Sequence, residues 1–234
     1  MKIVKRKIVN KKGFFITMEG FEGSGKTTIA KRLKQTMSEN GFNVILTKEP
    51  GGTLVGDRIR QILLERESEG LGYKAELLLF AASRSENVRV NILPALNQDY
   101  IVISDRYFDS TTAYQGYGRG IGLDVINYLN KLAIEDVIPD ITFFLDVDTE
   151  IGLKRSTIFN NGKEMRFEDE FIQKKEIQGK LFLDRVRDGY YQIYRKNPDR
   201  IEIIDTNRDI DIVLNDVVRI LNKKLPNKFK RISI

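Results

Sequence analysis

The sequence contains neither cysteine nor histidine, and these two absences remove several kinds of chemistry. Without cysteine, the chain has no disulfide framework, no thiolate zinc site and no cysteine nucleophile. Without histidine, it has no imidazole metal ligand, no Ser-His-Asp triad and no histidine proton shuttle. Any catalysis must therefore use carboxylates, lysine, arginine, hydroxyl groups, backbone amides and a metal ion held by oxygen.

Long apolar runs are also missing, because none approaches the roughly 18 residues that a membrane-spanning helix needs. Residues 1–13 are basic, but no long apolar stretch follows them, so we expect no secretory signal peptide. The lack of cysteine is consistent with a cytoplasmic protein, which is the location that we predict. We likewise predict no membrane partner.

The chain has 234 residues, with 39 Lys or Arg against 33 Asp or Glu and a formal net charge of +6. A hydrophobic fraction of 41% is enough for a sizeable core, and the 31% of charged residues are mixed in sign, which argues against disorder. The modest positive charge by itself is consistent with nucleic acid, an acidic membrane surface, small anionic substrates or no charged partner at all.

Short runs of β-forming residues alternate with helical patterns along the chain. Strands are predicted at 14–18, 44–47, 100–105, 141–146 and 201–205. Helices are predicted at 26–40, 53–66, 74–96, 110–115, 123–137, 149–156, 171–196 and 209–224, with a glycine-rich loop at 116–122. This alternation predicts one α/β domain with a parallel sheet that helices cover on both faces.

We place this domain at residues 13–225, between a basic N-terminal extension at 1–12 and a C-terminal tail at 226–234. The sequence shows no internal repeat and no interdomain linker. The two flanking segments are therefore expected to be appendages of the domain.

The strongest local signal is GFEGSGKT at residues 20–27, which fits G-x-x-x-x-G-K-[ST] between a predicted strand and a predicted helix. The glycines let backbone amides turn toward one centre, and the helix that follows adds its N-terminal dipole. Lys26 brings a positive charge to the β- and γ-phosphates, and Thr27 offers a hydroxyl to Mg²⁺. The predicted nucleotide-binding loop consists of Gly20, Phe21, Glu22, Gly23, Ser24, Gly25, Lys26, Thr27 and Thr28.

Other classes of phosphate-loop protein carry motifs that this chain lacks. A switch GTPase needs a D-x-x-G loop and an N-K-x-D guanine reader, and an AAA-type motor needs a strand that ends in Asp-Glu. This chain instead carries KEPGGT at 48–53 and three segments that contain arginine: FAASR at 80–84, DRY at 105–107 and YQGYGRG at 114–120. All except FAASR follow a predicted strand end, where ligands bind in open α/β sheets.

Taken together, these segments resemble thymidylate kinases of the bacterial type, from about Gly13 to Leu221. The resemblance implies phosphoryl transfer from ATP to dTMP with Mg²⁺ as cofactor, as a step of dTTP biosynthesis. It also implies the P-loop NTPase fold: a five-stranded parallel sheet in the order 2-3-1-4-5, flanked by helices, with a mobile lid at about 155–170. The family is usually homodimeric.

The resemblance assigns the phosphate and sugar ends of the dTMP site residue by residue. Glu22 matches the carboxylate that accepts a hydrogen bond from the sugar 3′-hydroxyl. Glu49 matches a residue that organises the acceptor site. Arg60 and Arg106 match arginines on the dTMP phosphate, which suits a guanidinium because it can bind phosphate oxygens bidentately.

The base end of the site is assigned in the same way. Phe80 matches the ring that stacks on thymine, and Arg84 matches the side chain that hydrogen-bonds the base edge. Thr111 and Gln115 match positions that read the base. Tyr114 matches a ring beside the sugar, where it can exclude a 2′-hydroxyl.

For catalysis, the resemblance implies charge neutralisation rather than a proton relay. Phosphoryl transfer between two phosphates mainly needs positioning and electrostatic stabilisation. Asp105, at a strand end, is suited to hold Mg²⁺ through water or to accept from a phosphate-binding arginine, so Thr27 and Asp105 are the predicted metal residues. The predicted catalytic residues are Lys26, Asp105, Arg106, Arg155 and Arg166.

The lid is the part that departs from the family pattern. Arg155 and Arg166 are predicted to clamp the γ-phosphate in preference to Lys163, because a planar guanidinium fits spread charge better. Met165 replaces the usual Asp before Arg166, and residues 171–181 look like an insertion. Asn207 and Arg208, after the last strand, fall where the family holds adenine.

Two rival functions remain open at this stage. One is another nucleoside monophosphate kinase on the same scaffold, such as a dUMP- or dGMP-directed enzyme. The other is a nucleic-acid-binding P-loop protein, suggested by the basic tails, although the chain lacks a recognition-helix motif and RNP-like aromatics. We predict ATP and dTMP as partners and no nucleic acid.

Overall fold

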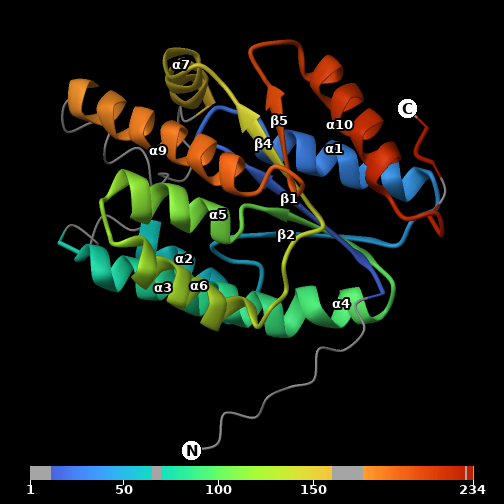
Figure 1. Cartoon of the computed structure of the whole chain (residues 1–234), viewed down its shortest axis with the longest axis horizontal. Coiled ribbons are helices and arrows are strands. Elements are labelled where there is room, and N and C mark those ends of the chain that lie inside the picture. Colours follow the sequence, from blue (N-terminus) through green and yellow to red (C-terminus); the bar gives the residue numbers. More distant parts are fainter. Residues whose placement is uncertain (1–11, 65–69, 160–175, 230, 234) are drawn as a thin grey trace, which may run out of the picture.

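Five parallel strands form one sheet in the order β2-β3-β1-β4-β5, as the resemblance implies (Figure 1). The computed structural model describes residues 12–64, 70–159, 176–229 and 231–233. The strands are β1 Phe14–Glu19, β2 Val44–Lys48, β3 Ile101–Asp105, β4 Ile141–Asp146 and β5 Ile201–Asp205. Every bound lies within one residue of its prediction, and the α/β P-loop fold class is confirmed.

Helices connect the strands and cover both faces of the sheet. The α-helices are α1 Lys26–Glu39, α2 Leu54–Leu64, α3 Tyr73–Asn87, α4 Leu93–Asn97, α5 Phe108–Thr111, α6 Leu123–Ile134, α7 Thr149–Phe159, α9 Glu176–Lys196 and α10 Ile210–Lys224. Two π-helical segments extend neighbouring helices: η2 Val88–Ile92 joins α3 to α4, and η3 Thr112–Gly118 continues α5.

The glycine-rich segment 116–122 was predicted as a loop, but it begins as helix, because η3 continues to Gly118. A Cβ atom at Gly118 would lie 2.7 Å from Phe182 of α9, so the missing side chain serves close helix packing rather than a turn. Helix α6 is also shorter than predicted. It ends at Ile134 because Glu135 adopts the left-handed conformation with a φ of 48°.

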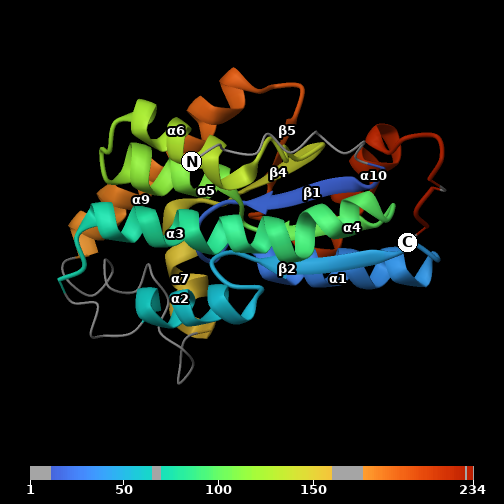
Figure 2. The same ribbon diagram turned by 90° about the horizontal axis from the view of Figure 1, so that it is seen from below.

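Alternation along β1 builds the core on both faces of the sheet. Phe14, Ile16 and Met18 pack into one cluster with buried residues of α1 and α10. Phe15 points to the other face, where Tyr107 and residues of η2 and α4 surround it. Figure 1 shows the sheet between these layers, with α1 and α10 on one side and α3 and α4 on the other, and Figure 2 looks onto the sheet from the side of α3 and α4. All five carboxyl strand ends therefore meet at one edge.

The C-terminal tail returns to the core, which differs from the expected appendage. Ile232 is 4% exposed and belongs to the same cluster as α1 and α10. The side-chain amide of Asn222 donates to the Ile232 carbonyl at 2.9 Å and accepts from its backbone N–H at 2.8 Å. Burial of the apolar side chain and these two bonds hold the tail in place.

Some sequence predictions fall outside the described residues. These are residues 1–11 of the N-terminal extension, 160–170 of the lid and 171–175 of the insertion; residues 176–181 begin α9. The division into extension, domain and tail stays a prediction. Within the described ranges, no helix combines the length and the apolar character that crossing a bilayer requires.

Candidate active site

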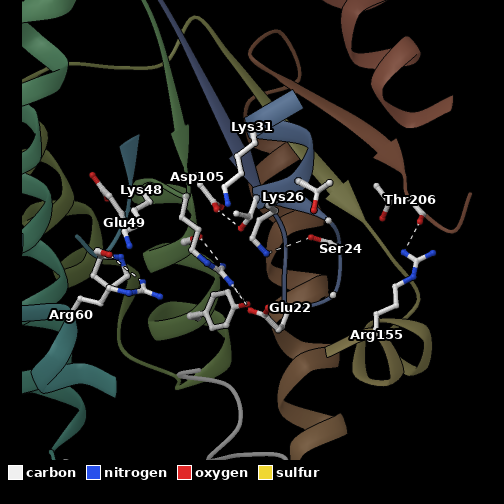
Figure 3. Close-up of a pocket in the computed structure, with 18 of the residues that line it drawn as sticks. Glu22, Ser24, Lys26, Lys31, Lys48, Glu49, Arg60, Asp105, Arg155 and Thr206 are labelled. Atoms are coloured by element: carbon white, nitrogen blue, oxygen red, sulfur yellow. Dashed lines mark hydrogen bonds and ion pairs between the residues drawn. The ribbon is translucent and has the colours of Figure 1, made fainter. Parts of the chain in front are cut away.

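One large cavity of about 1130 Å³ opens at the carboxyl edge of the sheet. It extends from the loop after β1, past the ends of β2 and β3, to side chains of α3 and η3 (Figure 3). The predicted site residues that line it are Glu22, Gly23, Ser24, Gly25, Lys26, Thr27, Thr28, Glu49, Arg60, Phe80, Arg84, Asp105, Arg106, Thr111, Tyr114, Gln115, Arg155 and Arg208. Chain segments far apart in sequence therefore face one space.

Three predicted residues are placed otherwise, and a fourth is not described. Gly20 does not line the cavity, and its carbonyl accepts a hydrogen bond from Arg106. Phe21 is fully buried in the cluster beneath α9, so its side chain does not face a nucleotide. Asn207 instead bridges two strand-end loops, accepting from the Asp148 backbone at 3.0 Å. Arg166 lies outside the described residues.

The loop between β1 and α1 forms a cradle of backbone amides. Gly23 and Gly25 adopt φ values of 76° and 86°, and a Cβ atom at Gly23 would meet the Gly152 carbonyl at 2.1 Å. The Lys26 ammonium donates to the Phe21 carbonyl at 2.7 Å and lies 3.4 Å from Ser24 Oγ, as Figure 3 shows in part. The loop thus combines an anion-binding backbone with a positive charge.

A hydroxyl and a carboxylate meet beside this loop. Thr27 Oγ1, at the start of α1, donates to Asp105 Oδ2 at 2.5 Å. Strand pairing causes the contact, because β3 lies next to β1 with Asp105 opposite Met18. Both oxygens suit a hard cation such as Mg²⁺. In the described ranges, no group of three or more acidic, His or Cys side chains could hold a metal, so phosphate or water oxygens would complete its coordination.

Arg106 is held in an uncommon conformation directly after β3. Its φ is 71°, in the left-handed region that costs energy for a residue with a side chain. The guanidinium donates to the Gly20 carbonyl at 2.9 Å and to Tyr114 Oη at 3.3 Å, and it lies 3.8 Å from Glu22. These contacts aim the Arg106 charge between the nucleotide loop and Tyr114.

A buried ion pair supports the other end of the cavity. Arg84 of α3 is 1% exposed, and its Nε donates to Glu49 Oε2 at 2.7 Å. The remaining guanidinium nitrogens donate to Asn130 and to the Tyr107 carbonyl. Burial raises the pKa of Glu49 above its ordinary value, and the Arg84 charge opposes that rise. Arg84 therefore neutralises a buried carboxylate as well as lining the cavity.

Two polar atoms near the acceptor end are buried without a hydrogen-bond partner in the described part of the chain. They are Arg60 Nε and Thr111 Oγ1, and both residues line the cavity. Arg60 also donates through Nη1 to the Pro50 carbonyl at 3.2 Å. Because buried polar groups are normally paired, these two atoms are candidates for contact with a ligand.

The two arginines at the donor side are fixed to the chain at the end of β5. Arg155 of α7 donates to the Thr206 carbonyl at 2.8 Å, as drawn in Figure 3. Arg208 donates to the Asp205 carbonyl and pairs with Asp216 at 2.8 Å. Both line the cavity, and Figure 3 shows Arg155 on the side opposite to Arg60.

Glu19 is a buried carboxylate that the sequence analysis missed. It ends β1, is fully buried and accepts from Ser110 Oγ at 2.5 Å, from the Tyr107 backbone at 2.8 Å and from Tyr190 Oη at 3.1 Å. Burial raises its pKa to about 7, Asp109 adds to the rise, and Ser110 and Arg106 oppose it. A charged residue at the end of an apolar strand was the available signal.

The parallel sheet, the glycine-turned loop and the opposing arginines define an enzyme of the P-loop kinase class. Comparison with protein families narrows this class, because the model of the family described as thymidylate kinase matches residues 18–217. The chain belongs to the thymidylate kinase family.

Several known proteins support this assignment. A thymidylate kinase of Clostridium novyi is 40% identical over 206 residues, which is 88% of this chain and 97% of that protein. One of Chlorobaculum tepidum is 47% identical over 190 residues, covering 81% and 88% of the two chains. The solved thymidylate kinase of Ehrlichia chaffeensis superposes with a TM-score of 0.71 at 40% identity, covering 89% of this chain and 98% of that one.

Proposed function

We propose that the protein transfers the γ-phosphoryl group of ATP to dTMP, giving ADP and dTDP. One observation carries the proposal: a single cavity joins the amide cradle around Lys26 to the acceptor end around Phe80 and Gln115. Two anionic nucleotides that enter from opposite ends can meet there between the side chains of Arg106 and Arg155.

The reaction needs no side chain to move a proton. A phosphate oxygen of dTMP attacks the γ-phosphorus, and the bond from that phosphorus to its bridging oxygen breaks as ADP leaves. Lys26 neutralises the β- and γ-phosphates, Arg106 holds the dTMP phosphate and Arg155 contacts the transferred group. Arg166 is expected to do the same from the lid. A chain without histidine can therefore perform this step.

Thr27 and Asp105 are the residues that would hold Mg²⁺, and their contact supports this role. The cation would supply charge neutralisation on the phosphate oxygens during transfer. Asp105 also places a negative charge beside Arg106, which is its chain neighbour. Removal of divalent cation with EDTA should abolish turnover, and added MgCl₂ should restore it.

At the acceptor end, the proposed roles agree with how the side chains are held. Thr111 has a buried hydroxyl without a partner in the described ranges, as a base reader requires. Tyr114 is 4% exposed and fixed by Arg106, so its ring can exclude a 2′-hydroxyl. Phe80 and Glu22 line the same cavity, which supports the roles proposed for them: Phe80 stacks on thymine and Glu22 accepts from the 3′-hydroxyl.

A coupled assay of ADP release with a panel of monophosphates tests the proposal. With ATP and MgCl₂, dTMP should give the highest kcat/KM, ahead of dUMP, dCMP and dGMP. Formation of dTDP is then verified by chromatography. Equal or better turnover of a purine monophosphate, or no dTDP at all, would refute the assignment.

We also propose that two copies associate through α2, α3 and α6. These helices pack side by side, as Figure 2 shows, and their outer faces carry large exposed apolar residues. Leu54, Leu78, Tyr128 and Leu132 are 73%, 56%, 70% and 59% exposed. Large exposed apolar residues on neighbouring helices are typical of a protein interface.

Sedimentation of the wild type and of two variants tests this interface. Leu132→Asp should convert a dimer into a monomer. Ile212→Asp on α10, which is 49% exposed but on another side of the molecule, should leave the mass unchanged. A monomeric wild type would exclude the dimer. A cytoplasmic location and the lack of a nucleic-acid partner stay predictions.

A further inference from the structure

A hydrogen bond behind the cavity fixes which way the Gln115 amide points. Gln115 is 2% exposed and lines the cavity, and its Nε2 donates to Glu76 Oε1 at 2.7 Å. A primary amide donates through nitrogen and accepts through oxygen, so binding one end determines the direction of the other. No local sequence pattern distinguishes Glu76 from helix-surface glutamates.

Glu76 is itself held as an acceptor. It lies in the first turn of α3, is 3% exposed, and receives Arg119 Nη2 at 2.8 Å on Oε2. Arg119 Nε lies 3.4 Å from Oε1, and the guanidinium covers the Tyr73 ring at 4.4 Å. A carboxylate has no N–H or O–H to offer, so a flipped Gln115 amide would set two oxygens against each other.

The amide oxygen is consequently left for a ligand. Gln115 Oε1 accepts no hydrogen bond from the described residues, and the side chain borders the cavity where the base is proposed to bind. A 2,4-dioxopyrimidine such as thymine carries an N3–H donor on its base-pairing edge. Cytosine carries an unprotonated acceptor at the same ring position, so two acceptors would meet and neither would be paired.

We propose that Glu76 is a positioning residue that selects dioxopyrimidine over cytosine by fixing the Gln115 amide with its oxygen toward the base. Glu76 acts through Gln115 and does not itself line the cavity. Arg119 supports the arrangement by keeping Glu76 in place from the far side. This inference rests on the proposed dTMP kinase function and adds the side chain that makes its base reader directional.

The decisive variant is Glu76→Gln, which has nearly the same shape but can donate to the Gln115 oxygen. The amide then loses its fixed direction. We expect the KM for dTMP to rise about tenfold and the kcat/KM ratio of dTMP to dCMP to fall about tenfold, in line with one lost base-edge hydrogen bond. The KM for ATP and the kcat at saturating dTMP should stay within about twofold.

A reversed pair keeps the test valid should Glu76→Gln perturb the fold. In the double variant Glu76→Gln with Gln115→Glu, the new amide donates to the new carboxylate, whose second oxygen still faces the base. This variant should recover most of the lost discrimination. Glu86→Gln is the matched control, because it makes the same change in an exposed ion pair on the same helix.

The outcomes separate this inference from the proposed function. If wild-type protein forms no dTDP, the proposed function fails before any variant is compared. If the wild type is active but Glu76→Gln leaves both the KM for dTMP and the dTMP to dCMP ratio unchanged, the positioning role is wrong. Equal loss toward dTMP and dCMP, without recovery in the reversed pair, would also overturn it, since that result describes a purely structural carboxylate.

Discussion

The two ends of the cavity are built by different means. The donor end centres on one continuous stretch, residues 20–28, whose glycines and helix N-terminus form a backbone cradle, with Arg155 and Arg208 beside it. The acceptor end gathers side chains from α2, α3, η3 and two strand-end loops, and it depends on buried charge pairs such as Arg84 with Glu49. A backbone cradle is thus local, whereas a base-reading surface needs long-range contacts.

The same contrast appears in what each end neutralises. At the donor end, the Lys26 ammonium contacts the Phe21 carbonyl and lies near the Ser24 hydroxyl oxygen. At the acceptor end, Arg84 and Arg119 each pair with a buried glutamate. Replacements at the donor end should therefore reduce turnover while the protein stays folded. Replacements at the acceptor end should affect stability and substrate binding together.

The largest expected effect comes from the donor end. Lys26→Ala removes the charge that the transition state needs, and kcat should fall about 10³-fold. Calorimetric binding of dTMP should be unchanged, because no acceptor contact is lost. The control is Lys34→Ala, an exposed lysine on the same helix α1. If Lys26→Ala weakened dTMP binding as much as it lowered kcat, the two ends of the cavity would not have separate roles.

The next effect should come from the acceptor end. Arg84→Met keeps much of the side-chain volume but leaves Glu49 buried without its cation, which should lower the free energy of unfolding by about 3 kcal/mol. The KM for dTMP should rise in the same variant. Urea denaturation measures the stability change.

Arg89→Met provides the matched comparison for Arg84. Arg89 lies on the same region of the chain but pairs with Glu86 at the surface, and its side chain is 58% exposed. Its loss should leave the unfolding midpoint nearly unchanged. Equal midpoints for the two variants would contradict the structural role assigned to the buried pair.

A smaller effect should appear in the pH dependence of stability. The pKa of Glu19 rises to about 7 in the folded protein from an ordinary value of 4.5, so the native state holds more protons than the unfolded state between these values. Glu19 therefore adds to the free energy of unfolding below pH 4.5, and this contribution is lost as pH rises through 7. Between pH 5 and pH 7 this loss amounts to about 2 kcal/mol.

Glu19→Gln tests that expectation because an amide cannot titrate. Thermal unfolding followed from pH 5 to pH 8 should show a declining midpoint for the wild type and a flatter profile for the variant. Parallel profiles would show that Glu19 does not titrate in this window. Glu19 lies between the donor and acceptor ends of the cavity, because Ser110 donates to Glu19 and accepts from Arg106.

Sequence patterns were sufficient wherever the relevant residues are neighbours in the chain. The short run of β-forming residues at 14–18 and the glycines that follow it predicted strand β1 and the loop after it, because strand propensity and positive φ are local properties. The sequence pattern also predicted helix α10, and Asp209 caps it by accepting from the Asp211 backbone. Family resemblance then supplied the residues of the acceptor end that local patterns do not identify.

Only the tertiary structure decided which buried charges pair. Glu76 and Gln115 are 39 residues apart, and Glu19 and Tyr190 are 171 apart, so no local pattern links them. The strand order brings such segments together, and burial then obliges each carboxylate to find a donor. Residue composition and spacing by themselves determined the alternation of strands with helices and the phosphate-binding loop. The direction of the Gln115 amide, the pKa of Glu19 and the docking of the tail at Ile232 depend on contacts that exist only after folding.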